Sequence, residues 1–136
     1  MTQSWFFRGT VFRKGRDRNI MLAQRYRFHG RRSIQLVFKH GDTLKTGHMI
    51  VRFQKNVRRR DSRAAVVVSK KVAKKAHDRN RIRRRMYETL RTQWQTIPGS
   101  YDLVYIVSSH RIAELPAPKL TEEITAAIHH IANSSR

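Results

Sequence analysis

The sequence predicts an α+β fold, a two-layer α/β sandwich with elements in the order αβββαβα. Three observations carry this prediction. Apolar residues recur every three or four positions in three segments, which is typical of helices with one buried face. In shorter segments they alternate or run continuously, which is typical of strands. The chain has 136 residues, of which 39% are hydrophobic, so one domain with its own core is expected.

The N-terminal region is rich in arginine and has no stable hydrophobic period. Residues 1–32 are therefore expected to be mostly disordered until they bind a partner. Within them, residues 1–20 are interpreted as a disordered basic extension that is dispensable for folding, because Met21 would make a natural start. The remaining residues, 21–136, are predicted to form a single domain.

The first helix and the first three strands are short. Ser33 is predicted to cap a two-turn helix that carries Ile34, Val37 and Phe38 and ends at Gly41. The predicted strands are 43–45, 48–53 and 64–69. The second strand alternates, with Met49, Val51 and Phe53 on one face, and the third is a continuous apolar run that suggests cover on both faces.

The central helix has one apolar stripe and one basic face. Asp78 is the predicted N-cap and Pro98-Gly99 the predicted end. The stripe consists of Ile82, Met86, Leu90, Trp94 and Ile97. At 100° per residue, Arg81, Arg84 and Arg91 fall on the opposite side. A strand over 101–107 and an amphipathic helix from Leu120 to Ile131 complete the order.

The charge points to a polyanionic partner. Thirty Lys and Arg residues stand against nine Asp and Glu, giving a formal net charge of +21. Repulsion at this level opposes compaction unless a polyanion neutralises it. Nucleic acid is the leading candidate; an anionic membrane is second, but no long lysine-rich amphipathic helix is evident.

The absence of cysteine excludes disulfides, a thiolate nucleophile and Cys-based zinc sites, and it fits a reducing compartment. No stretch has the length of a membrane span, and the apolar residues near the N-terminus are too few for a signal peptide. The expected location is the cytoplasm, with no membrane partner.

The predicted nucleic-acid site surrounds the start of the central helix. Guanidinium groups and free amides at a helix N-terminus both favour phosphate, and an asparagine amide can also contact a base edge or a ribose hydroxyl. The residues predicted to bind are Lys70, Lys71, Lys74, Lys75, Arg79, Asn80, Arg81, Arg83, Arg84 and Arg85.

Two motifs give a resemblance to a known family. Ser69-Lys70-Lys71 follows the valine run, and Arg79-Asn80-Arg81-Ile82-Arg83-Arg84 opens the central helix. Together they resemble the protein subunit of bacterial ribonuclease P, from about Tyr26 to the final helix. The resemblance implies a left-handed βαβ crossover through the central helix, an exception to the usual hand. It also implies a protein that assists a catalytic RNA in the endonucleolytic removal of the 5′ leader from precursor tRNA.

The resemblance further implies two contact regions and a metal. The arginine motif and its preceding loop would bind the catalytic RNA. A cleft between the first helix and the sheet would hold the single-stranded leader, and its candidate walls are Ile34, Phe38, Arg52, Val68 and Lys70. Where the family usually has aromatic residues, this chain has Ile34 and Arg52, so Phe38 would do more of the stacking. Mg²⁺ would be bound mainly by the RNA.

No catalytic constellation is evident in the protein itself. His77 is interpreted as a loop residue near RNA, while His129 and His130 diverge because neighbours on a helix point apart. No metal ligand is assigned, and chemistry is expected from the RNA and Mg²⁺. The main rival hypothesis is a structural RNA-binding protein of the ribosomal-protein type. The mixed α/β pattern disfavours a DNA-packaging protein, and the missing catalytic constellation disfavours a self-sufficient ribonuclease.

Overall fold

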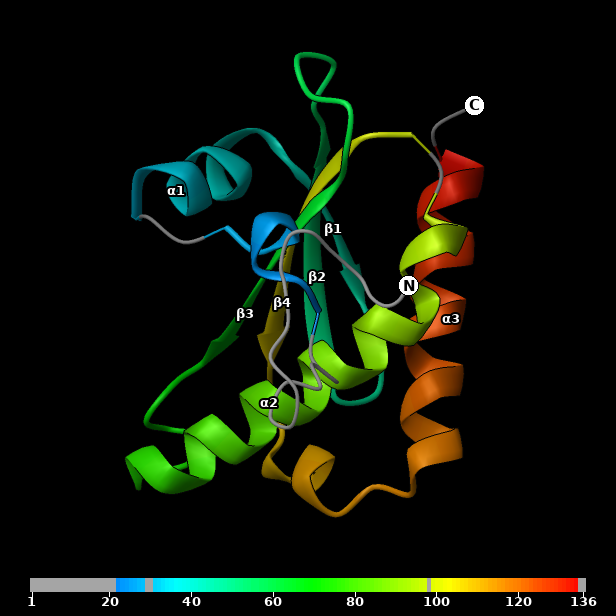
Figure 1. The fold of residues 1–136 in the computed structure, drawn as a ribbon. Coiled ribbons are helices and arrows are strands. Elements are labelled where there is room, and N and C mark those ends of the chain that lie inside the picture. The colour runs from blue at the N-terminus through cyan, green and yellow to red at the C-terminus, as the bar shows by residue number, and fades with distance from the viewer. Residues whose placement is uncertain (1–21, 29–30, 98, 135–136) are drawn as a thin grey trace, which may run out of the picture.

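Four strands form one mixed sheet in the order β1-β2-β4-β3 in the computed structural model, which describes residues 22–28, 31–97 and 99–134 (Figure 1). The predicted extension over residues 1–20 lies outside the described residues. The predicted element order is confirmed. The helices and strands are α1 (Arg31–His40), β1 (Asp42–Lys45), β2 (Met49–Lys55), β3 (Arg63–Val68), α2 (Ala76–Gln93), β4 (Tyr101–Val107) and α3 (Ala117–Ser134). Three 3₁₀ turns lie at Gln24–Tyr26, Trp94–Thr96 and His110–Ala113.

The strand pairings create the predicted crossover. β2 is antiparallel to both β1 and β4, whereas β3 is parallel to β4. Two parallel strands need a connection that returns the chain to the end of the sheet where the first strand began, and α2 is this connection. In Figure 1, β3 and β4 run downward behind α2, with β4 to the right of β3, so the crossover is left-handed.

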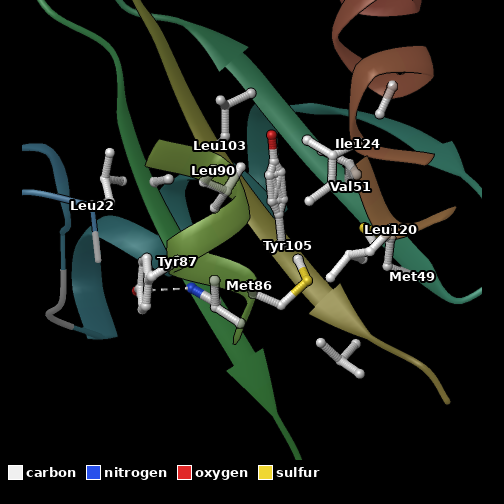
Figure 2. Close-up of a cluster of buried hydrophobic side chains, with 14 of the residues drawn as sticks. Leu22, Met49, Val51, Met86, Tyr87, Leu90, Leu103, Tyr105, Leu120 and Ile124 are labelled. Carbon is white, nitrogen blue, oxygen red and sulfur yellow. Dashed lines mark hydrogen bonds between the residues drawn. The ribbon is translucent and has the colours of Figure 1, made fainter. Parts of the chain in front are cut away.

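The main core lies between the sheet and the layer formed by α2 and α3 (Figure 2). The predicted face of β2 supplies Met49, Val51 and Phe53 to this core, all at most 5% exposed. The predicted stripe of α2 is also confirmed, because four of its residues are buried there and the fifth packs against them: Ile82, Met86, Leu90 and Trp94, with Ile97.

Helix α1 covers part of the opposite face of the sheet. A smaller core lies there and contains Val37, Ala65 and Val104.

Tyr87 adds a contact that the stripe did not predict. It is 5% exposed, and its hydroxyl accepts a hydrogen bond from the amide of Val66 at 3.2 Å (Figure 2). β3 lies at an edge of the sheet, where backbone amides lack a neighbouring strand. The tyrosine therefore fixes α2 to β3 and satisfies a buried donor.

Residues 22–28, here called the N-terminal strap, correct the prediction that residues 1–32 are mostly disordered. Leu22 is 2% exposed in the main core, and Phe28 is 4% exposed in the smaller core on the other face. The Leu22 amide donates to the Tyr87 carbonyl at 3.2 Å, and the Phe28 amide donates to the Ala64 carbonyl at 3.0 Å. Two buried anchors and these backbone bonds hold the strap across the edge of β3.

Helix α1 differs from its prediction at its start and in the exposure of one side chain. It begins at Arg31, so Ser33 lies inside the helix and is not its N-cap. Phe38, a predicted wall of the leader cleft, is 42% exposed. Gly41 does follow the helix, but for a reason of space: a Cβ atom there would lie 2.5 Å from the Val37 carbonyl oxygen and 2.8 Å from that of Phe53.

The C-terminal half also extends the predicted elements. Helix α3 begins at Ala117, so Pro118 lies in its first turn. Proline is tolerated there because the N–H group that it lacks would have no hydrogen-bond partner within the helix. The turn His110–Ala113 was not predicted; it buries Ile112 between β4 and α3. Among the described helices, none is long and apolar enough to cross a membrane.

One titratable contact joins α3 to the turn between β1 and β2. The Glu123 carboxylate accepts hydrogen bonds from the Thr46 hydroxyl and from the His48 amide at 2.8 Å, and it pairs with His48 Nδ1 at 2.8 Å. Burial alone would raise the pKa of Glu123, but the bonds from Thr46 and His48 outweigh burial and lower it. The carboxylate therefore stabilises the fold when it is ionised.

We predict that this contact makes stability fall in acid. Because the folded-state pKa is lowered, its contribution is present above the unfolded pKa and is lost as pH falls through the folded pKa. Glu123→Gln should lower the free energy of unfolding by roughly 1 kcal/mol at pH 7. The deficit should shrink toward zero in acid. Urea unfolding from pH 7 to pH 3 measures this, with the exposed neighbour Glu122→Gln as the control. A deficit that does not change with pH would contradict the assignment.

Candidate nucleic-acid interface

Helix α2, which carries most of the basic surface, begins about one turn earlier than predicted. The helix starts at Ala76 with Lys75 as the N-cap residue, and no side chain caps it. Asp78, the predicted N-cap, instead lies in the first turn, where its negative charge is favourable to the helix dipole. The Arg79 amide donates to the Lys75 carbonyl at 3.1 Å. The arginines therefore follow the turn that carries the unpaired amides.

Arg79 turns back onto the loop that precedes the helix. Its Nη1 atom donates to the carbonyl oxygens of Ala73 at 3.0 Å and Lys74 at 2.7 Å. The same loop is closed by bonds from the amides of Val72 and Ala73 to the Ser69 carbonyl. Arg79 therefore fixes the shape of the basic loop as well as adding to its charge.

Arg85 is directed away from the other predicted contact residues. Its Nη1 atom donates to the carbonyl oxygens of Ile112 at 2.8 Å and Ala113 at 3.0 Å. These bonds attach α2 to the 3₁₀ turn that precedes α3. Arg85 therefore has a role in the packing of the fold, and its contact with nucleic acid stays a prediction.

The remaining arginines of the motif surround a hollow of about 520 Å³. Its lining residues are Arg27, His77, Asn80, Arg81, Arg83, Arg84 and Tyr87. Arg83 Nη1 donates to the Asn80 side-chain oxygen at 2.6 Å, which leaves the Asn80 amide nitrogen as a donor. No carboxylate is among these lining residues, so the hollow is suited to phosphate oxygens.

Arg27 is the residue of this hollow that the sequence analysis missed. It comes from the N-terminal strap, and its guanidinium lies 5.1 Å from the centre of the Tyr87 ring. Burial lowers the pKa of Arg27, against the opposing effect of Tyr87, and its Nε atom is buried with no hydrogen-bond partner among the described residues. Only the sequence position of Arg27, within a region predicted to order on binding, could have suggested it.

Four lysines extend the positive surface along the loop between β3 and α2. All four, Lys70, Lys71, Lys74 and Lys75, are exposed, as are Asn80, Arg81 and Arg84. His77 is also exposed, with Nδ1 3.6 Å from Asp78. In the part of the chain that the structure describes, no group of three His, Cys, Asp or Glu residues could hold a metal ion.

The predicted cleft residues do not all share one face of the sheet. Val68 is 6% exposed and belongs to the main core beneath α2 and α3, so it cannot line a cleft beside α1. The side chain that faces α1 is its neighbour Val67, which packs against the smaller core with Ile34 and Ile106. The prediction was wrong by one residue in the strand, which inverts the face.

The register builds an apolar floor beside α1. Ile50 pairs with Ile106 across β2 and β4, and Val67 pairs with Ile106 across β3 and β4. All three side chains are half-buried. Lys45 pairs with Ile50 at the β1 edge and is exposed, so a basic side chain borders this row. We call Ile50, Ile106 and Val67 the sheet floor.

Arg52 closes the end of α1 instead of facing open solvent. Its Nη2 atom donates to the carbonyl oxygens of Val37 and Phe38, and its Nη1 atom donates to the Thr43 hydroxyl. The guanidinium also lies 5.8 Å from the centre of the Phe38 ring. Arg52 therefore orients Phe38 and the last turn of α1. Lys70, the last of the predicted cleft residues, is exposed in the loop that follows the C-terminal end of β3.

Fold and surfaces together define a basic α+β protein with an arginine hollow near a helix start and an apolar row on the sheet. Comparison with known proteins identifies the family. A family model described as Ribonuclease P matches residues 22–132. The chain belongs to the ribonuclease P protein family.

Individual relatives agree with this assignment. The chain is 34% identical over 99 residues to the ribonuclease P protein component of Roseiflexus castenholzii, covering 73% of this chain and 80% of that protein. It is 35% identical over 101 residues to that of Thermotoga maritima, covering 74% and 77%. A solved structure of the RNase P protein from Thermotoga maritima is similar with a TM-score of 0.67 at 30% identity, covering 75% of this chain and 94% of that one. The Staphylococcus aureus RNase P protein shares the fold, with a TM-score of 0.65 at 20% identity over 79% and 94% of the two chains.

The contacts of the arginines predict that two substitutions in one motif act differently. Arg79→Ala should lower the free energy of unfolding by about 1–2 kcal/mol, because two hydrogen bonds to carbonyls are lost. Arg81→Ala should change it by less than about 0.5 kcal/mol, because Arg81 is exposed. Thermal or urea unfolding of both variants measures this difference. Equal stabilities would contradict the role assigned to Arg79.

Proposed function

We propose that this chain is the subunit that assists a catalytic RNA in the endonucleolytic removal of the 5′ leader from precursor tRNA. Membership of the family implies an RNA partner and a role in tRNA processing. The observation that carries the finer proposal is the acid-free hollow at the start of α2, together with the separate sheet floor beside α1. The two surfaces suit two different features of RNA.

The hollow and the lysine loop are assigned to the catalytic RNA. Arg81, Arg83 and Arg84 present guanidinium groups around one hollow, and guanidinium forks match phosphate oxygens in two-bond geometry. Arg27 lies half-buried in the same place with no carboxylate beside it. A structured RNA supplies the closely spaced phosphates that such a cluster needs, and its binding should depend strongly on salt.

The face beside α1 is assigned to the single-stranded leader. The sheet floor is apolar and half-buried, which suits the faces of unpaired bases and excludes a duplex with its bases stacked inside. Phe38 is exposed at 42% on α1, where a ring can stack on a base. Lys45 borders the row and provides a contact for the leader backbone.

In this proposal the chemistry belongs to the RNA partner and to Mg²⁺ bound mainly by that RNA. The protein neutralises phosphate charge around the metal sites, positions the leader and tightens binding of the metal by the RNA. We expect it to act in the cytoplasm, where bacterial transcripts are processed.

Reconstitution tests the function directly. The full chain, mixed with a ribonuclease P catalytic RNA and a precursor tRNA at low Mg²⁺, should stimulate 5′ cleavage. Arg81→Gln with Arg84→Gln should weaken binding to the catalytic RNA and reduce the salt dependence by roughly one unit of slope per lost phosphate contact. Absence of stimulation would reject this function and favour a structural RNA-binding protein of the ribosomal-protein type.

The leader assignment predicts a difference between two exposed side chains of α1. Phe38→Ala should weaken binding of precursor tRNA by roughly 5- to 150-fold, because loss of one stacked base costs about 1–3 kcal/mol. It should leave binding of mature tRNA, which has no leader, nearly unchanged. Affinities of the assembled complex for both RNAs measure this, and Leu36→Ala, which removes another exposed apolar side chain from α1, is the control. Equal losses for precursor and mature tRNA would contradict the assignment.

A further inference from the structure

Arg52 stands where β2 meets the end of α1. Along β2 it alternates with the buried residues Val51 and Phe53, so its side chain is on the same face of the sheet as Ile50 of the sheet floor. It is half-buried and pairs across the β1–β2 ladder with Thr43. A basic side chain therefore lies on the face that is assigned to the leader.

The guanidinium of Arg52 is almost fully engaged by the fold. Its Nη2 atom donates to the Val37 carbonyl at 3.4 Å and to the Phe38 carbonyl, and its Nη1 atom donates to the Thr43 hydroxyl at 2.5 Å. Its Nε atom is buried with no hydrogen-bond partner among the described residues. A guanidinium has five N–H groups, so a single one, on Nη1, remains for another partner. The two-bond fork that binds phosphate is not available.

The same guanidinium holds Phe38 in two ways. It binds the main-chain carbonyl of Phe38, and its central carbon lies 5.8 Å from the centre of the ring, within the range of attraction between a cation and an aromatic face. The last turn of α1 is also fixed by the Gly41 amide, which donates to the Val37 carbonyl at 2.7 Å. A ring that is already oriented loses less conformational entropy when a base stacks on it.

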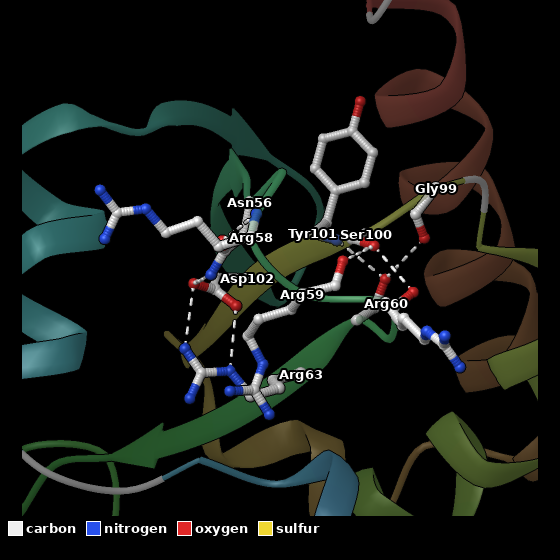
Figure 3. Close-up of polar contacts among 10 residues, drawn as sticks. Asn56, Arg58, Arg59, Arg60, Arg63, Gly99, Ser100, Tyr101 and Asp102 are labelled. Atoms are coloured by element: carbon white, nitrogen blue, oxygen red, sulfur yellow. Dashed lines mark hydrogen bonds and ion pairs between the residues drawn. The ribbon is translucent and has the colours of Figure 1, made fainter.

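Arg63 shows a similar contact with a different outcome. Its guanidinium lies 4.8 Å from the centre of the Phe28 ring and reaches both oxygens of Asp102 at 3.2 Å (Figure 3). Phe28 is 4% exposed, so this contact stabilises the smaller core. Arg52 has no carboxylate partner among the described residues, and the ring beside it is 42% exposed. The contact of Arg52 therefore orients a ring at the surface.

We propose that Arg52 is a positioning residue for the leader, which holds the Phe38 ring for stacking on an unpaired base and does not bind the leader backbone itself. The inference rests on the proposed function for the identity of the leader. Stacking and charge are then supplied by different residues of this face. Phe38, supported by Arg52, takes the base, and Lys45 at the edge of the sheet floor takes a phosphate.

A double-mutant cycle tests the positioning role. Arg52→Ala, Phe38→Ala and the double variant are compared in the complete complex, with precursor tRNA and with mature tRNA. Arg52→Ala should weaken binding of precursor tRNA by roughly 2- to 30-fold, the value of one cation–aromatic contact, and leave mature tRNA nearly unchanged. In the Phe38→Ala background it should have little further effect, because no ring is left to position. Losses that simply multiply would overturn the proposal.

Salt dependence separates positioning from a phosphate contact. Lys45→Gln should reduce the salt slope of precursor binding by about 0.7 unit, the value for one contact to a single strand, whereas Arg52→Ala should leave the slope nearly unchanged. Arg52→Lys should not restore affinity, because an ammonium keeps the charge but not the planar fork that reaches two carbonyls. A slope loss with Arg52→Ala that Arg52→Lys restores would assign Arg52 to phosphate and overturn the proposal.

Ile124→Val controls for a loss of stability alone. Ile124 is fully buried in the main core, on the other face of the sheet from α1, so its truncation destabilises the protein without touching Phe38. It should not change the ratio of precursor to mature affinity. In the protein without RNA, hydrogen exchange of the Gly41 amide should accelerate more in Arg52→Ala than in Ile124→Val. Equal changes of that ratio in both variants would reduce Arg52 to a structural role and overturn the proposal.

The cycle also separates this inference from the function on which it rests. A precursor-specific loss with Phe38→Ala but not with Arg52→Ala would leave the leader assignment intact and overturn the role of Arg52. If Phe38→Ala has no precursor-specific effect, the leader assignment fails and the role of Arg52 fails with it.

Discussion

Burial of one side of α2 fixes the direction of every arginine on that helix. Ile82, Met86 and Leu90 are at most 1% exposed between the sheet and α3. Tyr87 adds a bond to the edge of β3, and Leu22 of the N-terminal strap donates to the Tyr87 carbonyl. Because the buried side of α2 is fixed against the core, the side chains on the other sides of this helix have fixed directions relative to the sheet. The basic surface is therefore a consequence of the hydrophobic core, and a stable core is a condition for binding RNA.

The scarcity of acids divides the arginines into two groups. Nine acidic residues cannot pair with thirty basic ones. Arg52, Arg79 and Arg85 instead donate to backbone carbonyls, each to two of them, at the ends of helices and loops. Carbonyls at the C-terminal end of a helix or in a loop lack intrahelical donors, so an arginine satisfies them without a carboxylate. Arg81 and Arg84 are not used in this way and remain exposed, and in the proposed function the phosphates of an RNA are their counterions.

Periodicity was sufficient to predict the element order, the buried face of β2 and the stripe of α2, because these patterns span whole elements. Single positions were less predictable. Asp78 has the chemistry of an N-cap, yet the helix begins earlier, at Ala76. Val68 was placed on the wrong face because a continuous apolar run has no alternation that identifies its faces. Arg27 was missed because its contact with Tyr87 joins segments sixty residues apart in the sequence.

The absence of cysteine allows one measurement to test the division into two surfaces. Lys75→Cys places a single thiol at the start of α2, and Lys45→Cys places one beside the sheet floor. Each variant carries a short photo-crosslinker in the complete complex of protein, catalytic RNA and precursor tRNA. The account predicts that the Lys75 position labels the catalytic RNA and that the Lys45 position labels the 5′ leader. Labelling of the same RNA segment from both positions, or the reverse assignment, would contradict it.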